Sequence, residues 1–570
     1  MEFGGVIFLS RFSKTLLLLT LLSGLCVRLA IAWQPWDWLI RTGSFGDDAC
    51  YYAAIAFNIA NGNGPTTDGI HMTNGFQPLW AFMLVPIYAL GTSKESAINI
   101  AMTTLALLST LTGLVLFLLA KQLWDERVAL WTAFFWMTSP TVLRQSLNGM
   151  ETGLYVFMLS VAALLVVRHS SNAKPAMLQP IAIGFVLSLI VLSRIDGLPF
   201  AIAGMIACAA GWAKQRRSNS RQPNSLKGIL QFSVNSFTVR IIAISVAFAL
   251  PLFPWFAYSI TVVGKVIPES GEAVRCLSLA YIGAVDEGIT WRVLRYSFAQ
   301  AASTLLRAQQ WNFIKAKLVY AFGSYGAMLF IAALLLLALL ISLWLFRVGY
   351  FHEVVRMLRG IFKLWFWIFH AGIVILVYSL YQFGWWFFPR YFFVATPLGI
   401  IVGSVLAEAL RLSMEKLSCR RRLRHISTLS VVAIVLLQLV QLYVGWHYMQ
   451  VRAFGGFEEY LNVALWLKEH TPKDARIGMF QSGTASYLSE RTVINLDGVV
   501  NGDALKAMLD KQMLKYVVSQ GITYIADWEE LIQTLLIGRS PEGELSRWRL
   551  IRLRAGEMSV YKLVRGTQGG

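Results

Sequence analysis

The chain has 570 residues, of which 56% are hydrophobic and 14% charged, and its formal net charge is +19. Soluble domains usually carry about 25% charged residues, so this composition excludes a soluble protein with one anchor and indicates a chain embedded in the bilayer. The basic residues lie in short loops between apolar segments, where they set topology and meet anionic headgroups. The positive charge is therefore not read as a sign of nucleic-acid binding.

Arg11 and Lys14 precede an apolar run at 15–33, which is followed by aromatic and proline residues rather than by a small-residue cleavage site. This pattern predicts a retained first membrane helix with a cytoplasmic N-terminus. A spanning helix needs about 20 apolar residues. Ten further segments are expected to span: 97–119, 128–142, 152–167, 178–193, 197–213, 239–259, 324–346, 364–383, 391–410 and 427–446.

The apolar segment Phe76–Leu90 is short, and charge decides whether it spans. If it does not, the basic loops fall on one side and the arginines between 420 and 424 lie inside. If it does, those arginines lie outside, against the positive-inside rule. We therefore expect this segment to lie along the outer surface or dip into it, within one outer loop at 34–95. The fold class follows: a polytopic α-helical membrane protein with about eleven spans.

The outer loop contains the run Gly46–Tyr52, with sequence GDDACYY. Ala49–Ala60 is predicted to form an amphipathic surface helix with Asp47 or Asp48 at its N-cap. Capping explains only one of these carboxylates. The other is a candidate general base for an acceptor hydroxyl, with its neighbour orienting that group. Adjacent carboxylates also suit Mg²⁺ or Mn²⁺, so a metal role for the pair stays open.

The loop continues through Asp68–Trp80, with sequence DGIHMTNGFQPLW. Its Asn-Gly step is a turn signal, and His71 and Asn74 are expected to face the headgroup zone. An unperturbed histidine titrates near neutral pH, which makes His71 a functional candidate. The alternative is an ordinary surface histidine.

Several ionisable residues lie at the outer ends of apolar segments, where their cost makes them candidates for function. Glu151 opens a helix, and stabilisation of the helix dipole is its alternative role. Arg194 and Asp196 separate two apolar runs, and pairing with each other is the alternative. Lys265 and Glu269 follow the span at 239–259.

Arg390 lies in an aromatic belt at Gly384–Tyr391. Interfacial anchoring explains the tryptophans of this belt, whereas an outer-side arginine runs against the charge bias. Cations near the headgroup plane form strong charge-assisted hydrogen bonds to phosphate. The outer face thus combines carboxylates for an acceptor hydroxyl, cations for a lipid phosphate and apolar helices for a polyprenyl tail.

The tail, 447–570, regains ordinary charge density and is predicted to form an α/β domain outside the membrane, whereas 1–446 forms the transmembrane domain. Helices are expected at Phe457–Glu469 and Ala504–Ser519. Strands are expected at Arg476–Phe480, Thr492–Leu496, Ile522–Ala526, Trp548–Arg554 and Val560–Val564.

These features together resemble the GT-C glycosyltransferases, polytopic enzymes that use lipid-phosphate-linked sugars. The resemblance covers most of the chain and rests on the acidic pair after the first span, the surface helix, the partly embedded segment and the outer tail. Three short motifs add to it: Asn148–Thr152, Ser193–Gly197 and Pro389–Tyr391. DDAxYY with TNGFxPLW is most similar to the branch of mycobacterial terminal arabinofuranosyltransferases and bacterial pilin arabinosyltransferases.

The resemblance implies that Asp48 or Asp47 is the catalytic carboxylate, with Asp48 preferred, and that Asp497 in the tail contacts the acceptor. Ile195 stands where many relatives have proline, so the turn around it departs from the pattern. The residues expected to bind the donor phosphate are Arg390, Arg194, Lys265, His71 and Asn74. The residues expected to support them are Glu151, Asp196, Tyr52 and Glu269.

The function implied is transfer of a sugar, with arabinofuranose preferred, from a polyprenyl-phosphate donor to an extracytoplasmic glycan or protein. The location implied is a bacterial inner membrane, with the active site on the periplasmic face. No phosphate-binding glycine-rich loop appears in the sequence, and the sugar–lipid bond itself supplies the energy. The alternative is a polytopic transporter or lipid-sugar flippase, which would leave the acidic pair and the folded tail unexplained.

Overall fold

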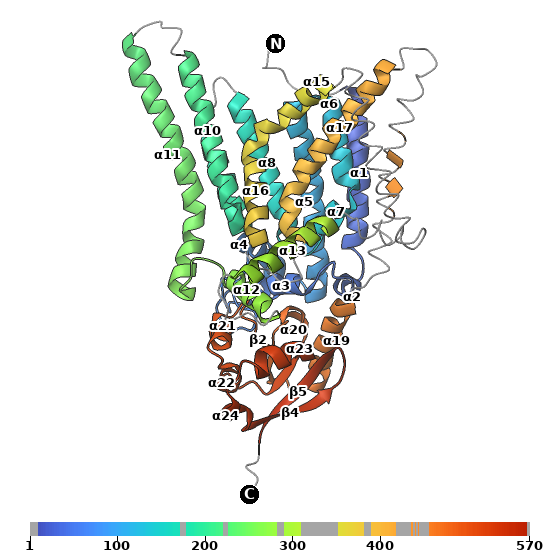
Figure 1. Cartoon of the computed structure of the whole chain (residues 1–570), viewed down its shortest axis with the longest axis vertical. Coiled ribbons are helices and arrows are strands. Elements are labelled where there is room, and N and C mark those ends of the chain that lie inside the picture. Colours follow the sequence, from blue (N-terminus) through green and yellow to red (C-terminus); the bar gives the residue numbers. More distant parts are fainter. Residues whose placement is uncertain are drawn as a thin grey trace.

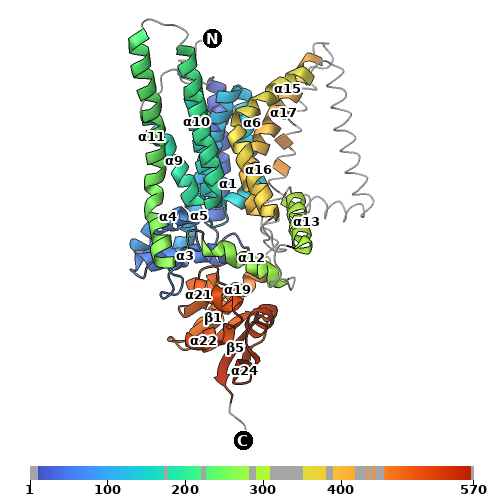
Figure 2. The ribbon, with the colours of Figure 1, turned by 60° about the vertical axis from the view of Figure 1, so that its left-hand side comes forward.

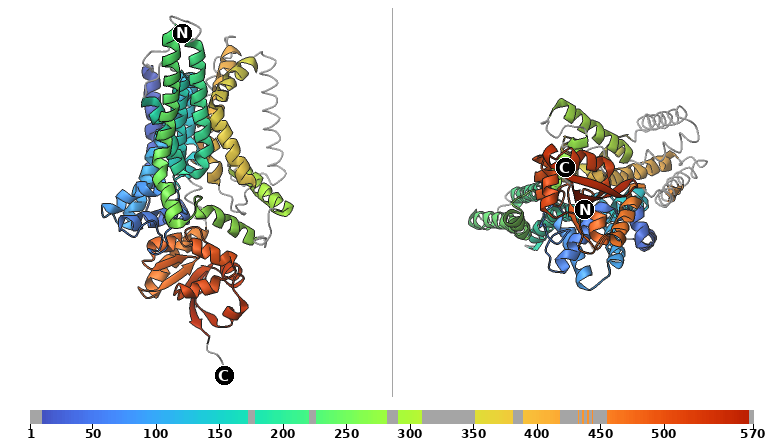
Figure 3. Two further views of the ribbon diagram at one scale, coloured as in Figure 1. Left: turned by 90° about the vertical axis from the view of Figure 1, so that its left-hand side faces the viewer. Right: turned by 90° about the horizontal axis from the view of Figure 1, so that it is seen from below.

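The structure is a computed structural model that describes residues 10–171, 178–219, 226–281, 290–308, 351–380, 389–417 and 455–566, with a few positions between 432 and 443. Long helices stand roughly side by side, and a small domain with a β-sheet lies beneath one end of them (Figure 1). The described part of the chain begins with α1 (Arg11–Ala32) in the helical part and ends with β5 (Met558–Arg565) in the sheet domain. Figure 3 shows the same division into a helical part and a sheet domain.

Seven helical segments within the described ranges are long and apolar enough to cross a membrane, with mean hydropathies from 1.5 to 2.1. They are Arg11–Ala32, Lys94–Leu123, Thr152–His169, Ile195–Ala213, Phe237–Val263, Val354–Leu380 and Arg390–Leu412. They correspond, in order, to all or part of α1 (Arg11–Ala32), α5 (Lys94–Leu123), α8 (Thr152–Ser171), η1 (Ile195–Gly197) with α10 (Leu198–Asn219), α11 (Leu226–Tyr258) with η2 (Ser259–Val263), α15 (Phe351–Arg359) to α16 (Trp365–Leu380), and η4 (Pro389–Ala395) with α17 (Thr396–Leu417).

A shorter apolar helix, α9 (Leu178–Ser193), packs mainly against α11. The spans expected at 324–346 and 427–446, and the arginines between 420 and 424, lie outside the described residues. The residues preceding Pro389 in the aromatic belt lie outside them as well.

The span expected at 128–142 is broken in the structure. Helix α6 (Glu126–Thr138) ends before Pro140, and a short α7 (Pro140–Ser146) follows. Proline has no backbone N–H, so it cannot donate to the carbonyl four residues earlier, which is that of Trp136. The buried guanidinium of Arg28 donates instead, from Nη2 to Trp136 O (3.4 Å) and from Nη1 to Met137 O (3.0 Å). A buried arginine thus caps the interrupted helix.

The outer loop contains three short helices: α2 (Trp36–Arg41), α3 (Asp47–Ala60) and α4 (Pro78–Ala89). Helices α3 and α4 pack against each other at the end of the bundle next to the sheet domain (Figure 2). At 1.5 Å per residue, the 12 residues of α4 extend about 18 Å, well short of the roughly 30 Å hydrocarbon core. Its length agrees with the expectation that 76–90 does not span.

Two further helices, α12 (Glu269–Tyr281) and α13 (Trp291–Ala308), lie at the same end of the bundle (Figures 1 and 2). Helix α13 contacts α16 and η4, and so lies beside the segment that carries Arg390.

The tail folds around a five-stranded sheet with order β2-β1-β3-β5-β4, in which β1 is parallel to β2 and β3 and the other pairs are antiparallel. The strands are β1 (Arg476–Met479), β2 (Thr492–Asn495), β3 (Tyr524–Trp528), β4 (Trp548–Arg554) and β5 (Met558–Arg565). The helices are α19 (Gly455–His470), α20 (Gly483–Leu488), α21 (Gly502–Leu509), α22 (Met513–Ser519), α23 (Glu529–Leu531) with η5 (Ile532–Ile537), and α24 (Glu542–Leu545).

All five expected strands are present, but two details of the tail differ from the expectation. The helix expected at Ala504–Ser519 is divided, because Lys511 adopts a positive φ of 56° between α21 and α22. Helix α20 has no counterpart in the expectation. It has only six residues and none is charged, so it is too short to show an amphipathic period.

The sheet domain is fitted closely onto the outer loop. A Cβ atom added to Gly75 would lie 1.9 Å from the carbonyl oxygen of Val499, and one added to Gly483 would lie 2.1 Å from the carbonyl oxygen of Asp47. Glycine is required at both positions because backbones approach each other directly. The outer loop and the tail therefore form one continuous structure.

We predict that Gly483→Ala loosens this contact, because the new methyl group must move more than 1 Å to clear Asp47 O. Hydrogen exchange measured on the full-length protein is expected to rise severalfold at the first turn of α3. Gly543→Ala is the control, since its added Cβ would meet nothing within 4 Å. Unchanged exchange in the Gly483 variant would contradict the close fit.

Candidate active site between the helical bundle and the sheet domain

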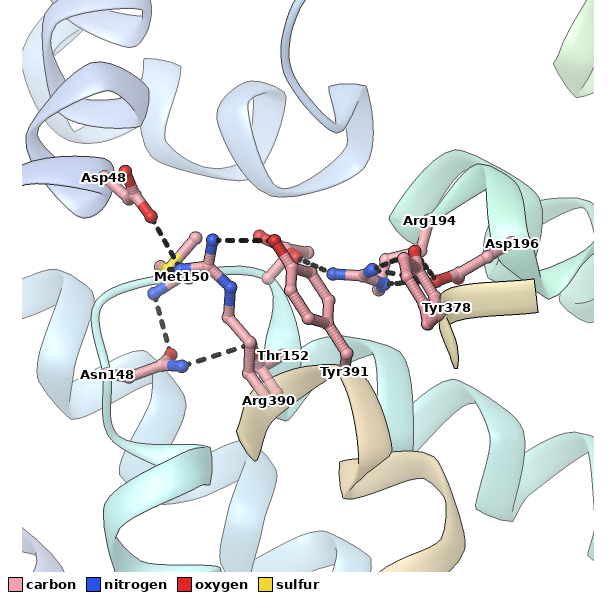
Figure 4. Close-up of polar contacts among 10 residues, drawn as sticks. Asp48, Asn148, Met150, Thr152, Arg194, Asp196, Tyr378, Arg390 and Tyr391 are labelled. Carbon is pink, nitrogen blue, oxygen red and sulfur yellow. Dashed lines mark hydrogen bonds and ion pairs between the residues drawn. The ribbon is translucent and has the colours of Figure 1, made fainter. Parts of the chain in front are cut away.

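Asp48 and Arg390 meet where α3 faces η4. Arg390 Nη1 donates to Asp48 Oδ2 at 2.7 Å, and it also lies 3.0 Å from the sulfur of Met150 (Figure 4). The Asp48 side chain is 40% exposed, whereas that of Arg390 is 15% exposed. The pair joins residues 342 positions apart in the sequence, and its carboxylate is open to solvent.

A second arginine, Arg194, lies in a buried polar network. Its guanidinium donates to Glu151 Oε1 at 2.7 Å and to Asp196 Oδ2 at 2.8 Å. The Tyr378 hydroxyl donates to Asp196 Oδ2 at 2.7 Å, and Tyr378 stacks on Tyr391 with ring centroids 4.8 Å apart. Because Tyr391 follows Arg390 in η4, the stack connects the buried network to the exposed pair.

The two arginines differ in the charge around them. Arg194 is buried between two carboxylates, so its positive charge is more than compensated within the protein. Arg390 forms an ion pair with Asp48, whose side chain is partly exposed to solvent. An incoming anion therefore has more to gain at Arg390. Of the cations expected to bind phosphate, Arg390 is the best placed, and the alternative of a simple pairing between Arg194 and Asp196 agrees with the geometry.

Asp47 turns away from Asp48 and into the sheet domain. Its carboxylate accepts from Thr484 N at 2.6 Å, Thr484 Oγ1 at 2.8 Å and Gly483 N at 3.3 Å. Burial raises the pKa of Asp47 to about 6, although the bonds from Thr484 oppose the shift. Its carboxylate thus connects the outer loop to the tail through these hydrogen bonds.

The prediction that Asp47 or Asp48 caps α3 is wrong. The N-cap residue is Gly46, with no side-chain capping bond, and α3 begins at Asp47 itself. Both carboxylates lie within the first turn, where they still interact favourably with the helix dipole. Their hydrogen bonds go to other segments: Asp47 accepts from Gly483 and Thr484, and Asp48 accepts from Arg390.

Tyr51, on the same helix, also reaches the sheet domain. Its hydroxyl accepts from Ser482 N at 3.0 Å and lies 3.2 Å from both Ser482 Oγ and Asn495 Nδ2. Asp497 and Asp527 are buried in this part of the tail. Burial raises the pKa of Asp497 to about 8 and that of Asp527 to about 7. Asp527 accepts backbone N–H bonds from Phe480 and Gln481, whereas Asp497 accepts one from Val499.

Tyr52 faces the membrane domain instead. Its side chain is buried, and burial, followed by the nearby Glu151 carboxylate, raises the pKa of the phenol. Tyr52 therefore lies beside the Glu151–Arg194 network.

Four other expected site residues lie around a separate cavity of about 570 Å³ or beside it. His71, Lys265 and Glu269 line this cavity, and neither Asp48 nor Arg390 does. Asn74 is buried and joins backbones: its Nδ2 donates to Lys265 O at 2.9 Å, and its Oδ1 accepts from Glu269 N at 3.1 Å. The structure thus separates these residues from the Asp48–Arg390 pair.

Several residues of the site were not expected from the sequence. Tyr378 and Tyr391 are uncharged at neutral pH, so the charge pattern of the span ends gives no signal for them. Ser482 and Thr484 lie in α20, which was itself missed. Asp527 had a usable signal: it lies at the end of a buried strand that runs parallel to β1, and polar residues at the carboxyl ends of parallel strands are common site residues.

Asp47 and Asp48 do not form a shared metal site. One carboxylate accepts three bonds from the sheet domain, and the other pairs with a guanidinium. Among the described residues, no group of three or more histidine, cysteine or acidic side chains could hold a metal ion. The donor set therefore does not fit Mg²⁺ or Mn²⁺, which need several oxygen ligands.

Comparisons with known proteins bear on the fold. ArnT from Cupriavidus metallidurans, in a structure bound to undecaprenyl phosphate, is 11% identical, and the match covers 95% of this chain and 97% of that one with a TM-score of 0.50. The chain has the GT-C fold. An archaeal oligosaccharyltransferase, AglB from Archaeoglobus fulgidus, in complex with an inhibitory peptide and a dolichol-phosphate, is 13% identical, with coverage of 98% and 75% and a TM-score of 0.46.

Two sequence comparisons give no function for the chain. Residues 446–564 match a family described as a domain of unknown function (DUF8728). The search of curated proteins finds no match for the sequence. The GT-C fold of the chain is thus established by its shape, and the roles of its residues have to be argued from their geometry.

We predict that Arg194→Met destabilises the protein by about 3–5 kcal/mol, because it leaves Glu151 and Asp196 buried without their cation. Arg390→Met is the matched control and should cost much less, since Asp48 is partly exposed and can hydrate. Thermal unfolding in detergent measures both variants. Equal losses would contradict the distinction between the two arginines.

We also predict that stability depends on pH through Asp497. Its pKa is raised from 3.8 to about 8 in the folded protein, so the folded state holds a proton that the unfolded state releases above about pH 4. This contribution to stability is complete below pH 4 and is lost as the pH rises to about 8. Asp497→Asn should flatten the fall in the tail's unfolding temperature, measured by calorimetry of the full chain between pH 5 and 8; an unchanged slope would contradict the assignment.

Proposed function

We propose that the chain is a membrane glycosyltransferase that moves a sugar from a polyprenyl-phosphate donor to an extracytoplasmic acceptor. The observation that carries this proposal is the Asp48–Arg390 pair, 2.7 Å apart at the end of the spans next to the sheet domain. A carboxylate and a guanidinium side by side are the two groups that sugar transfer from a phosphate requires. The GT-C fold and the undecaprenyl phosphate bound to ArnT support a lipid-phosphate donor.

In the proposed reaction, the donor phosphate binds Arg390 and replaces Asp48 as its partner. Arginine binds phosphate through paired, charge-assisted hydrogen bonds. Asp48, released from the ion pair, accepts the proton of the acceptor hydroxyl. The acceptor oxygen attacks the anomeric carbon, the bond from that carbon to the phosphate oxygen breaks, and polyprenyl phosphate leaves with the bonding electrons and its negative charge held by Arg390.

Other residues hold this arrangement in place. The stack of Tyr378 on Tyr391 positions η4, and the Arg194 network fixes the side chain of Tyr378. Asp47 fixes the first turn of α3 to the sheet domain by accepting a hydrogen bond from Thr484 N. In this proposal Asp48 is the base, and Asp47 positions it.

The sugar preferred in the proposal is arabinofuranose, because of the DDAxYY and TNGFxPLW motifs, and the acceptor is a glycan or a protein. The compartment is the periplasmic face of a bacterial inner membrane. The basic loops support this orientation, since it keeps the arginines between 420 and 424 inside.

We predict that Asp48→Asn abolishes transfer, with a loss of about 10²–10⁴ in kcat, while donor binding is kept because Arg390 remains. The assay uses purified protein with polyprenyl-phosphate arabinofuranose and hexose donors and follows both donor binding and sugar transfer. Asp47→Asn should instead lower stability, since an amide cannot accept all the bonds from Gly483 and Thr484. A transporter or flippase would transfer no sugar to an acceptor even in the parent protein, and that result, or unchanged transfer in the Asp48 variant, would refute the proposal.

A further inference from the structure

The cavity of about 570 Å³ is built by both domains. Its walls come from three segments: residues 70–72 of the outer loop, residues 262–272 at the junction of η2 and α12, and residues 501–510, which include all of α21. Its lining joins η2, which follows α11, to α21 of the sheet domain, and the end of α11 lies next to that domain (Figures 1 and 2). Because two domains must dock to form it, the cavity depends on the close fit between the outer loop and the tail.

The charges of the lining disfavour an anionic ligand. Four carboxylates line the cavity, and they face three basic side chains. The acidic residues are Glu269, Glu272, Asp503 and Asp510, and the basic residues are His71, Lys265 and Lys506. His71 Nδ1 lies 2.6 Å from the Asp68 carboxylate, and Lys265 Nζ lies 3.0 Å from that of Glu272. Two of the three basic groups are thus already neutralised, so a phosphate would meet net negative charge.

The lining suits a ligand that carries many hydroxyl groups. A carboxylate has two oxygens and accepts several hydrogen bonds. Met72, Val262 and Leu509 are exposed apolar side chains on the same walls, 45%, 53% and 39% exposed. Small-molecule sites combine such apolar surface with a few well-placed polar groups. Sugar rings match this combination because their hydroxyls donate to carboxylates while their C–H faces pack on apolar side chains.

One lining carboxylate is held rigidly. Glu269 is 4% exposed, and its Oε2 accepts from Thr73 Oγ1 at 2.9 Å. A Cβ on Gly502 would lie 2.0 Å from Glu269 Oε1, so glycine is needed for this contact with the tail. Asp503, directly after Gly502, is exposed at the cavity wall. A buried carboxylate held by a hydrogen bond and an exposed carboxylate therefore both face the cavity.

We propose that this cavity is a binding site for a neutral carbohydrate. The inference rests on the proposed transferase function, because it makes the ligand a part of the acceptor glycan away from the reacting hydroxyl. Neither Asp48 nor Arg390 lines the cavity, so the acceptor must be an oligosaccharide rather than a single sugar. The cavity then selects the acceptor, while the Asp48–Arg390 pair performs transfer.

The test measures binding of an α-arabinofuranosyl disaccharide, the corresponding trisaccharide and mannobiose to the full-length protein in nanodiscs. Saturation-transfer NMR reports binding without any need for turnover. The double variant Asp503→Ala/Asp510→Ala removes two exposed lining carboxylates and should weaken binding of the preferred oligosaccharide about tenfold or more. Asp474→Ala, an exposed acidic residue of the tail that does not line the cavity, is the matched control and should bind normally.

Asp48→Asn separates this inference from the proposed function. The expected result is full oligosaccharide binding without transfer. If the parent protein binds oligosaccharides through the cavity but transfers no sugar from any donor, the proposed function fails and the binding site stands. If transfer occurs but the Asp503/Asp510 variant binds and transfers like the parent, the binding site fails and the proposed function stands. Binding of Mn²⁺ at the cavity without any oligosaccharide binding would also overturn the inference.

Discussion

Adjacent residues of an α-helix project about 100° apart, and this constraint organises the whole outer side of the molecule. Asp47 and Asp48 begin α3, so their carboxylates cannot point the same way. One reaches Thr484 in the sheet domain and the other reaches Arg390 in η4. A pair that looks like a single acidic motif is therefore two separate contacts, one that holds the tail and one that faces the membrane boundary.

The membrane domain uses its two outer arginines in opposite ways. Arg194 lies between Glu151 and Asp196 and is buried, where an unpaired charge would be costly. Arg390 has a partner that remains partly in water. A charge that is fully compensated by buried carboxylates stabilises structure, whereas one whose carboxylate partner is hydrated can exchange that partner for a ligand. The stack of Tyr378 on Tyr391 connects the two, so the rigid network supports the exposed pair.

The sheet domain is a structural part of the outer loop. Gly75 and Gly483 allow backbones of the two regions to touch, and the Tyr51 hydroxyl enters the tail between Ser482 and Asn495. Burying Asp47, Asp497 and Asp527 near this contact has a cost, which appears as their raised pKa values. The same contacts fix the first turn of α3, which carries Asp48, to the sheet domain.

The sequence alone determined the features that depend on local composition and periodicity. Apolar runs located the seven spans found within the described ranges, loop charge argued against a crossing by 76–90, and β-rich runs located all five strands of the tail. Charge at span ends identified Asp48, Arg390, Arg194 and Glu151 as candidates. Only the tertiary structure decided their partners, because contacts between residues such as Asp48 and Arg390, 342 positions apart, leave no local pattern. Helix geometry and long-range packing, rather than residue type, separated the Asp47 and Asp48 side chains. They also placed His71 and Lys265 around a cavity that the Asp48–Arg390 pair does not line.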